Sequence, residues 1–130
     1  MTALLLDTHV IVWLDSQPER LSAAANAVIE SADELMVAGI SWFELAWLVQ
    51  RGRILPDLPL AAWLASLSED TRTLGITPSI ARTAALLPDT FPGDPADRLI
   101  FATAIEHGIP IVSKDRQMHE HASLGPEVIW

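Results

Sequence analysis

The chain has 130 residues and a formal net charge of −9, with 17 acidic residues against 8 Lys and Arg. Half of the residues are hydrophobic and 19% are charged, which is enough to bury a core and excludes a disordered chain or a coiled coil. Cysteine is absent, so disulfide scaffolds, cysteine-ligated zinc, iron–sulfur clusters and thiol catalysis are excluded. We therefore expect a single domain over residues 1–130 that meets a polyanion only locally or through metal cations.

The first residues and the longest apolar runs indicate in which cellular compartment the protein is expected. No basic region precedes Asp7, which argues against a secretory signal peptide. The longest apolar stretches, such as residues 99–105, are far too short to cross a bilayer. We therefore expect a cytoplasmic protein without a membrane span.

Short apolar runs alternate with helical segments along the chain. In chain order we predict a strand at 3–6, helices at 10–14 and 18–32, a strand at 35–38, helices at 41–51 and 59–67, a strand at 74–76, a helix at 78–87, a loop at 88–95, a helix from 95 to 108, and strands at 109–112 and 128–130. Such alternation predicts βαβ units and a parallel sheet covered on both faces. The expected fold is a three-layer α/β/α domain with four to five parallel strands.

Acidic residues follow the carboxyl ends of the predicted strands, at the edge of the sheet where open α/β folds bind ligands. Asp7 follows the first strand, Glu44 and Asp97 lie in the first turns of helices, and Asp115 follows the fourth strand. Carboxylates about 4 Å apart repel by roughly 4 kcal/mol per pair at an effective dielectric near 20. Oxygen ligands of this kind suit Mg²⁺ or Mn²⁺ better than Zn²⁺. Asp7 is the hardest to explain structurally, because a carboxylate between a buried strand and an apolar helix is costly without a partner.

Most of these acids also have an ordinary structural explanation. Ser41 and Glu44 match a helix capping box, and this role and a ligand role are compatible. Asp94 is more typical of a helix N-cap than of a ligand. Asp97 could merely favour the helix dipole, and Asp115 could be a turn residue.

Four motifs occur in order from residue 4 to about residue 130. They are Asp7-Thr8-His9-Val10 after a strand, Ser41 and Glu44 opening a helix, Asp94, Asp97 and Arg98 opening another, and Ser113 and Asp115 after a late strand. Each motif alone is weak, but the ordered set resembles the PIN-domain ribonucleases. More closely, the chain is similar to the VapC-type toxins of bacterial toxin–antitoxin pairs.

The resemblance implies a Mg²⁺- or Mn²⁺-dependent endoribonuclease that cleaves RNA through an acidic quartet. Matched position by position, the quartet is Asp7, Glu44, Asp97 and Asp115, each with a catalytic and metal-binding role. Thr8 and Ser113 match positions where the family often has a supporting hydroxyl. Asp94 competes with Asp97 for the third position, and the family motif favours Asp97.

The resemblance also implies partners. These are an RNA substrate and a small antitoxin that inserts a basic residue near the acidic pocket. The helix at 41–51 carries more apolar positions than one buried stripe requires, so part of it could serve the antitoxin or a homodimer contact. A helix buried centrally in the fold would explain the same pattern.

Two other functions fit the fold class. A non-catalytic interaction module would keep the fold without the chemistry, but the intact quartet argues against it. A phosphoryl-accepting, receiver-like domain would use an Asp nucleophile and Mg²⁺. That class needs an acidic pair after the first strand, where this chain has Asp7 and Thr8. An RNA cleavage assay with an acid variant separates the three.

Overall fold

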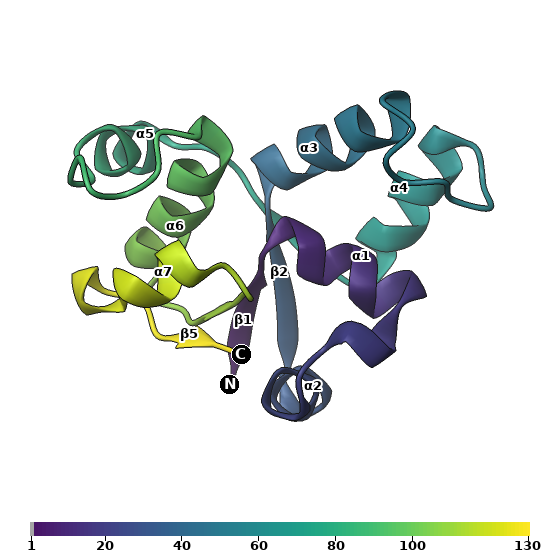
Figure 1. The fold of residues 1–130 in the computed structure, drawn as a ribbon, viewed down its shortest axis with the longest axis horizontal. Coiled ribbons are helices and arrows are strands. Elements are labelled where there is room, and N and C mark those ends of the chain that lie inside the picture. The colour runs from purple at the N-terminus through teal and green to yellow at the C-terminus, as the bar shows by residue number, and fades with distance from the viewer. Residues whose placement is uncertain (1) are drawn as a thin grey trace.

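The computed structural model describes residues 2–130 and shows a five-stranded sheet in the order β3-β2-β1-β4-β5. The strands are β1 (Ala3–Leu6), β2 (Glu34–Ala38), β3 (Arg72–Leu74), β4 (Ile111–Val112) and β5 (Val128–Ile129). Every strand pair is parallel. The predicted three-layer α/β/α architecture with a parallel sheet is confirmed (Figure 1).

Helices connect the strands and cover both faces of the sheet (Figure 1). They are α1 (Thr8–Ser16), α2 (Ala23–Ser31), α3 (Gly39–Gln50), α4 (Leu60–Glu69), α5 (Pro78–Ala85), α6 (Pro95–His107) and α7 (Arg116–Glu120), with 3₁₀ turns at Pro18–Arg20 and Ala122–Leu124. None of the helices within residues 2–130 is long and apolar enough to cross a membrane.

Strand β1 lies at the centre of the core, because alternate side chains point to opposite faces of the sheet. Leu4 and Leu6 pack on one face with residues of α1, α2 and α3. Leu5 packs on the other face with Ile100 and Phe101 of α6. All three leucines are buried, so the uninterrupted apolar run is the pattern expected of a strand covered on both sides.

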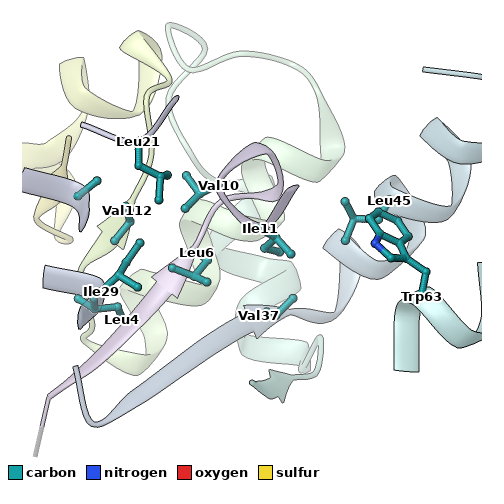
Figure 2. Packing of buried hydrophobic residues seen from close by; sticks show 11 residues of the cluster. Leu4, Leu6, Val10, Ile11, Leu21, Ile29, Val37, Leu45, Trp63 and Val112 are labelled. Atoms are coloured by element: carbon teal, nitrogen blue, oxygen red, sulfur yellow. The ribbon is translucent and has the colours of Figure 1, made fainter. Parts of the chain in front are cut away.

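Figure 2 shows the first of these clusters around β1 and β2. Val10 and Ile11 of α1 lie over Leu6 in this cluster. Farther along it, Leu45 of α3 meets Trp63 of α4, and both are buried. The cluster therefore fixes α1 and α3 against the same face of the sheet, and their N-terminal ends lie near its carboxyl edge.

Several predicted element boundaries differ from the observed ones. The helix expected at 10–14 runs over Thr8–Ser16, and the strand expected at 109–112 covers only Ile111–Val112.

Two further predicted boundaries are wrong for reasons that the contacts show. The helix predicted from residue 18 begins instead at Ala23, because the Ser22 hydroxyl accepts the Ala25 N–H and caps it. The third strand was expected at 74–76 but runs over Arg72–Leu74, in register with residues 36–38 of β2. At the third strand the apolar pattern was misleading, because the first two strand residues are exposed and polar, whereas Ile76 lies beyond the strand and is 50% exposed.

The start of α3 differs in a way that matters for the site. The helix begins at Gly39 with Ala38 as N-cap, and no side chain caps it. Ser41 and Glu44 therefore do not form the predicted capping box, and Glu44 lies in the second turn of the helix rather than the first. Helix α7 was not predicted at all, since five residues are too few to show a helical period.

The sheet order brings distant segments together. Strand β1 lies between β2 and β4. The chain runs from β1 outward to β2 and β3 and then crosses to β4 and β5 on the other side, which makes the boundary between β1 and β4 a topological switch point. Leu6 pairs with Val112, and the Asp7 N–H donates to the Val112 carbonyl at 3.1 Å. Asp7 and Ser113 consequently follow their strands side by side at the carboxyl edge.

Candidate functional site

Asp7 lies at the centre of this edge and is buried. It is the N-cap of α1, where its Oδ1 accepts the Thr8 N–H at 2.8 Å. Its Oδ2 accepts the Ser113 hydroxyl at 2.6 Å. Both carboxylate oxygens therefore have donors, which compensates the burial of the charge.

Ser113 and Asp115 form a short bonded loop after β4. The Ser113 Oγ accepts the Asp115 N–H at 2.9 Å while it donates to Asp7. The Oδ1 of Asp115 accepts the Gln117 N–H at 2.8 Å and caps α7. Asp115 is thus a helix N-cap rather than an ordinary turn residue, and a cap uses one of its two carboxylate oxygens.

Glu44 reaches the same edge from the second turn of α3. The Thr8 hydroxyl donates to its Oε1, and because that proton is used, the Ser41 hydroxyl is the donor in the 2.9 Å contact between Ser41 and Thr8. Burial raises the pKa of Glu44, the hydrogen bond from Thr8 lowers it, and the charges of Asp7 and Asp94 raise it further. The predicted supporting hydroxyls, Thr8 and Ser113, therefore each contact one acid of the proposed quartet.

Asp94 and Asp97 open α6 in different ways. Asp94 is the N-cap, as predicted, and its Oδ1 accepts the Ala96 N–H at 2.8 Å. Asp97, in the first turn, is half-buried and has no hydrogen bond to its carboxylate within residues 2–130. Its pKa is raised to about 7, first by burial and then by the charges of Asp7, Asp94, Asp115 and Glu44.

The four acids of the proposed quartet come from four segments, and the charges of the other three act on Asp97. In the part of the chain that is described, no three acidic or His side chains lie close enough together to coordinate a metal ion. The donor set nevertheless suits a hard divalent cation, because every ligand atom is an oxygen and the charge around Asp97 is uncompensated.

His9 lies beside Asp7 and forms a hydrogen bond with the loop after β4. Its Nε2 accepts the Lys114 N–H at 3.0 Å, so Nδ1 faces the Asp7 Oδ2 at 3.6 Å. Burial lowers the pKa of His9; the charges of Asp7 and Asp115 oppose that shift, and those of Lys114 and Arg20 add to it. The ring is therefore neutral at pH 7 and carries its proton on Nδ1.

Two residues outside the predicted set help to build the site. His119 makes a 2.8 Å hydrogen bond through Nε2 to the Ser113 carbonyl, which braces the loop that holds Asp115. Arg98 donates to five backbone carbonyls of the preceding helix and loop, those of Ala84, Leu87, Pro88, Phe91 and Pro92. Arg98 thereby fixes the entry to α6 and the position of Asp97. Arg98 belongs to the third sequence motif, but its partners could not be predicted, because any residue offers a backbone carbonyl; the same holds for the partner of His119.

A groove runs alongside the site between α1, α3, α4 and the loop at 51–59. Its volume is about 890 Å³. Its walls are mixed, and half of the lining residues are apolar, among them Val12, Trp13, Leu48, Ile54, Leu55 and Trp63. Leu55 is 85% exposed, which is unusual for a large aliphatic side chain and leaves an apolar surface open.

Comparisons with known proteins agree with this architecture. The family model of the PIN domain matches residues 4–124. The chain is 57% identical over 130 residues, the full length of both proteins, to a Mycobacterium tuberculosis protein named Ribonuclease VapC22.

Solved structures show the same fold at low sequence identity. A chain of VapBC-1 from nontypeable Haemophilus influenzae superposes with a TM-score of 0.72 at 14% identity, covering 98% of this chain and 96% of that one. A chain of the DNA-bound VapBC from Salmonella typhimurium gives 0.71 at 18% identity, covering 98% and 97%.

Proposed function

The chain belongs to the PIN-domain family, as a VapC-type member, and from this premise we propose that it is the endoribonuclease toxin of a toxin–antitoxin pair. Its full-length relative at 57% identity is named a ribonuclease. Structural neighbours of the same fold come from VapBC complexes. A toxin that cuts cellular RNA works where that RNA is, so we place its action in the cytoplasm.

The observation that carries this proposal is the environment of Asp97. Burial and the charges of four other acids raise its pKa to about 7, and three of these acids, Asp7, Asp115 and Glu44, come from segments far from α6 in the sequence. A fold that needs no chemistry here would gain stability by replacing one of these carboxylates. Like charges gathered at a ligand-binding edge favour a function that uses a cation.

We assign the roles of the chain's residues from their contacts. Asp7 and Asp97 hold Mg²⁺ or Mn²⁺ directly, and Glu44 and Asp115 complete the site through direct or water-mediated contacts. When bound, the divalent cation supplies charge neutralisation at the phosphate and activation of water.

Two hydroxyls position these acids rather than react. Ser113 holds the Asp7 Oδ2, and Thr8 holds the Glu44 Oε1. The buried hydrogen bonds keep the two carboxylates oriented before a cation or a phosphate arrives. Thr8 and Ser113 are therefore positioning residues.

A cleavage assay on RNA tests the assignment. We expect Mg²⁺- or Mn²⁺-dependent cleavage by the wild-type chain, loss of cleavage in EDTA, and loss in Asp97→Asn. Asp70→Asn is the matched control, because Asp70 is an exposed acid at the end of α4 and is not among the charges that raise the pKa of Asp97. Cleavage that survives EDTA, or an Asp97→Asn variant as active as wild type, would refute it.

The groove beside the site suits the expected antitoxin. An apolar segment can bury against Leu48, Ile54 and Leu55, and an Arg at its end can reach the acids and pair with a carboxylate in a bidentate contact. Such an Arg and the cation would compete for the same negative charge. Each should therefore weaken the binding of the other by the same factor.

Isothermal titration of the cognate antitoxin at several Mg²⁺ concentrations measures that coupling. Affinity should fall as Mg²⁺ rises, and Leu55→Ser should weaken binding at every Mg²⁺ concentration. Affinity that does not depend on Mg²⁺, with inhibition intact, would show that the antitoxin blocks RNA access without entering the acidic site.

A homodimer contact is the remaining use we propose for α3. Phe43 is 60% exposed and Trp47 is 49% exposed, and their rings stack at 5.8 Å on the outer side of the helix. Arg51 lies over Trp47 at 4.3 Å and partly covers it. Sedimentation of the wild type and of Phe43→Ser would test this, with a shift to monomer expected in the variant.

A further inference from the structure

Three aromatic rings and two cations gather beside Asp7, and we call this group the Trp13 platform. His9 lies 4.8 Å from Trp13, and Trp130 lies 5.7 Å from Trp13, measured between ring centroids. The Arg20 guanidinium lies 4.5 Å from the centre of the Trp13 ring and the Lys114 ammonium lies 5.8 Å from it. Residues of α1, the 3₁₀ turn after it, the loop after β4 and the residue that follows β5 thus meet at Trp13.

The two cations of the platform are not neutralised by carboxylates. Within residues 2–130, Arg72 and Arg116 form ion pairs with Glu34 and Glu120, whereas neither Arg20 nor Lys114 does. Both side chains are exposed and are held by the face of Trp13 through cation–π contacts instead. Their charges are therefore available to a ligand.

The platform adjoins the acids directly. His9 joins the two, because its Nδ1 faces Asp7 and its Nε2 accepts the Lys114 N–H. A chain of net charge −9 repels a polyanion at long range, so a phosphate backbone needs a local positive site close to the acids. Arg20 and Lys114 supply two positive charges there.

We propose that Arg20 and Lys114, held over Trp13, form a phosphate-binding subsite that guides a single-stranded RNA backbone toward the acidic site. The inference rests on the proposed ribonuclease function and names the residues that receive the substrate. It concerns binding of the strand, whereas the acids act on the bond to be cut. The two cations are positioning residues for the substrate.

RNA fits the platform better than the antitoxin does. The antitoxin is expected to bring a basic residue to the acids, and two uncompensated cations beside its path would repel that residue. The groove that shares Trp13 and Arg20 also carries Asp15 and Asp57, so it has charges of both signs along its length. The proposed RNA contact is accordingly limited to the platform.

Fluorescence anisotropy with a labelled single-stranded 12-nucleotide RNA in EDTA tests the subsite. In EDTA no metal-dependent cleavage takes place, so binding is measured whether or not the chain cuts RNA. The variants are Arg20→Gln, Lys114→Gln and the pair together. Arg72→Gln is the matched control, because it removes the same charge from the first residue of β3, at the opposite end of the strands from the site.

The double variant should weaken binding on the order of tenfold at 0.1 M salt. Each substitution should also lower the slope of log affinity against log salt by about 0.7, the value for one phosphate contact with a single strand. Arg72→Gln should leave the slope unchanged. In the cleavage assay, the double variant should raise KM with kcat nearly unchanged, and circular dichroism should show the native fold in every variant.

Several results would overturn the subsite. Equal effects of Arg72→Gln and the platform variants would show that only net charge matters. Loss of antitoxin binding with RNA binding intact would assign the platform to the antitoxin. A wild type that cuts RNA but binds it no better than the double variant would refute the subsite alone. A wild type that neither binds nor cuts RNA would refute the ribonuclease function as well.

Discussion

Asp7 and Asp97 belong to the same site and have opposite surroundings. Asp7 is buried, yet each of its oxygens accepts a hydrogen bond, from the Thr8 N–H and from the Ser113 hydroxyl. Asp97 is less buried but has like charges around it, and its pKa is raised to about 7. The fold itself stabilises the first charge and leaves the second uncompensated, so Asp97 is where a cation would gain most.

Charge-neutral substitutions at the two positions should separate these roles most strongly. Both Asp7→Asn and Asp97→Asn should abolish cleavage. Without metal, Asp97→Asn should raise the free energy of unfolding, because it removes repulsion and breaks no hydrogen bond. Asp7→Asn should lower that energy by about 1–2 kcal/mol, because an amide offers one acceptor oxygen in place of two.

Urea denaturation at pH 8 in EDTA measures both changes, with Asp70→Asn as the control for loss of an exposed acid. Equal stability changes in Asp7→Asn and Asp97→Asn would mean that the contrast between the two environments has no energetic consequence.

Removal of the Ser113 hydroxyl should make Asp7 resemble Asp97. Ser113→Ala deprives the Asp7 Oδ2 of its donor and the Asp115 N–H of its acceptor. We expect metal affinity to fall by about 10–100-fold, the usual effect of losing a group that orients a ligand. Titration calorimetry with Mn²⁺ checks this against Ser123→Ala, an exposed serine of the second 3₁₀ turn. Unchanged affinity would leave the Ser113 contact a purely structural one.

The pH dependence of stability should isolate Asp97. Its carboxyl pKa is about 4 in the unfolded chain and about 7 in the fold, so the native state binds more protons between those values. The free energy of unfolding without metal should therefore fall as pH rises from about 4 to about 7. After allowance for solvent screening at a half-buried group, Asp97 accounts for about 2 kcal/mol of that fall.

Denaturation of wild type and Asp97→Asn at pH 5 and pH 8 gives the contribution as a difference between the two chains. Saturating Mg²⁺ should reduce it, because the cation favours the ionised carboxylate. A wild type and a variant with the same pH dependence would place the uncompensated charge elsewhere.

The smallest effect is expected at Asp94. Asp94→Ala removes the acceptor for the Ala96 N–H at the start of α6 and should cost about 1 kcal/mol of stability. Relief of repulsion with Asp97 offsets part of this cost. Cleavage should persist in the variant, in contrast to Asp97→Asn. If Asp94→Ala were inactive and Asp97→Asn were active, the metal-binding role would belong to Asp94 instead of Asp97.

The sequence predicted the general location of the site because strand ends are local features. The apolar run Ala3–Leu6 ends at an acid, and Asp94 and Pro95 begin a helix that Gly108, at a φ of 63°, ends. Both elements are present with those limits. Hydrophobic pattern and capping chemistry act within a few residues, so they can be read without knowledge of the fold.

The contacts that distinguish the acids could not be read in that way. Ser41 occupies the position of a capping residue in the sequence, but in the fold its hydroxyl donates to Thr8, 33 residues away. The Ser113 hydroxyl bonds to Asp7 across 106 residues. Neither pairing has a local pattern, because it depends on which strands lie next to each other.

By itself, the sequence determined a parallel α/β fold and the set of acids at its carboxyl edge, since apolar periodicity and the ends of strands and helices are encoded locally. Only the tertiary structure decided that Asp7 has two donors whereas Asp97 has none. The sheet order places Ser113 beside Asp7 and brings Asp7, Asp115 and Glu44 near enough to raise the pKa of Asp97. Electrostatic energy depends on distance and burial in space, and neither follows from spacing along the chain.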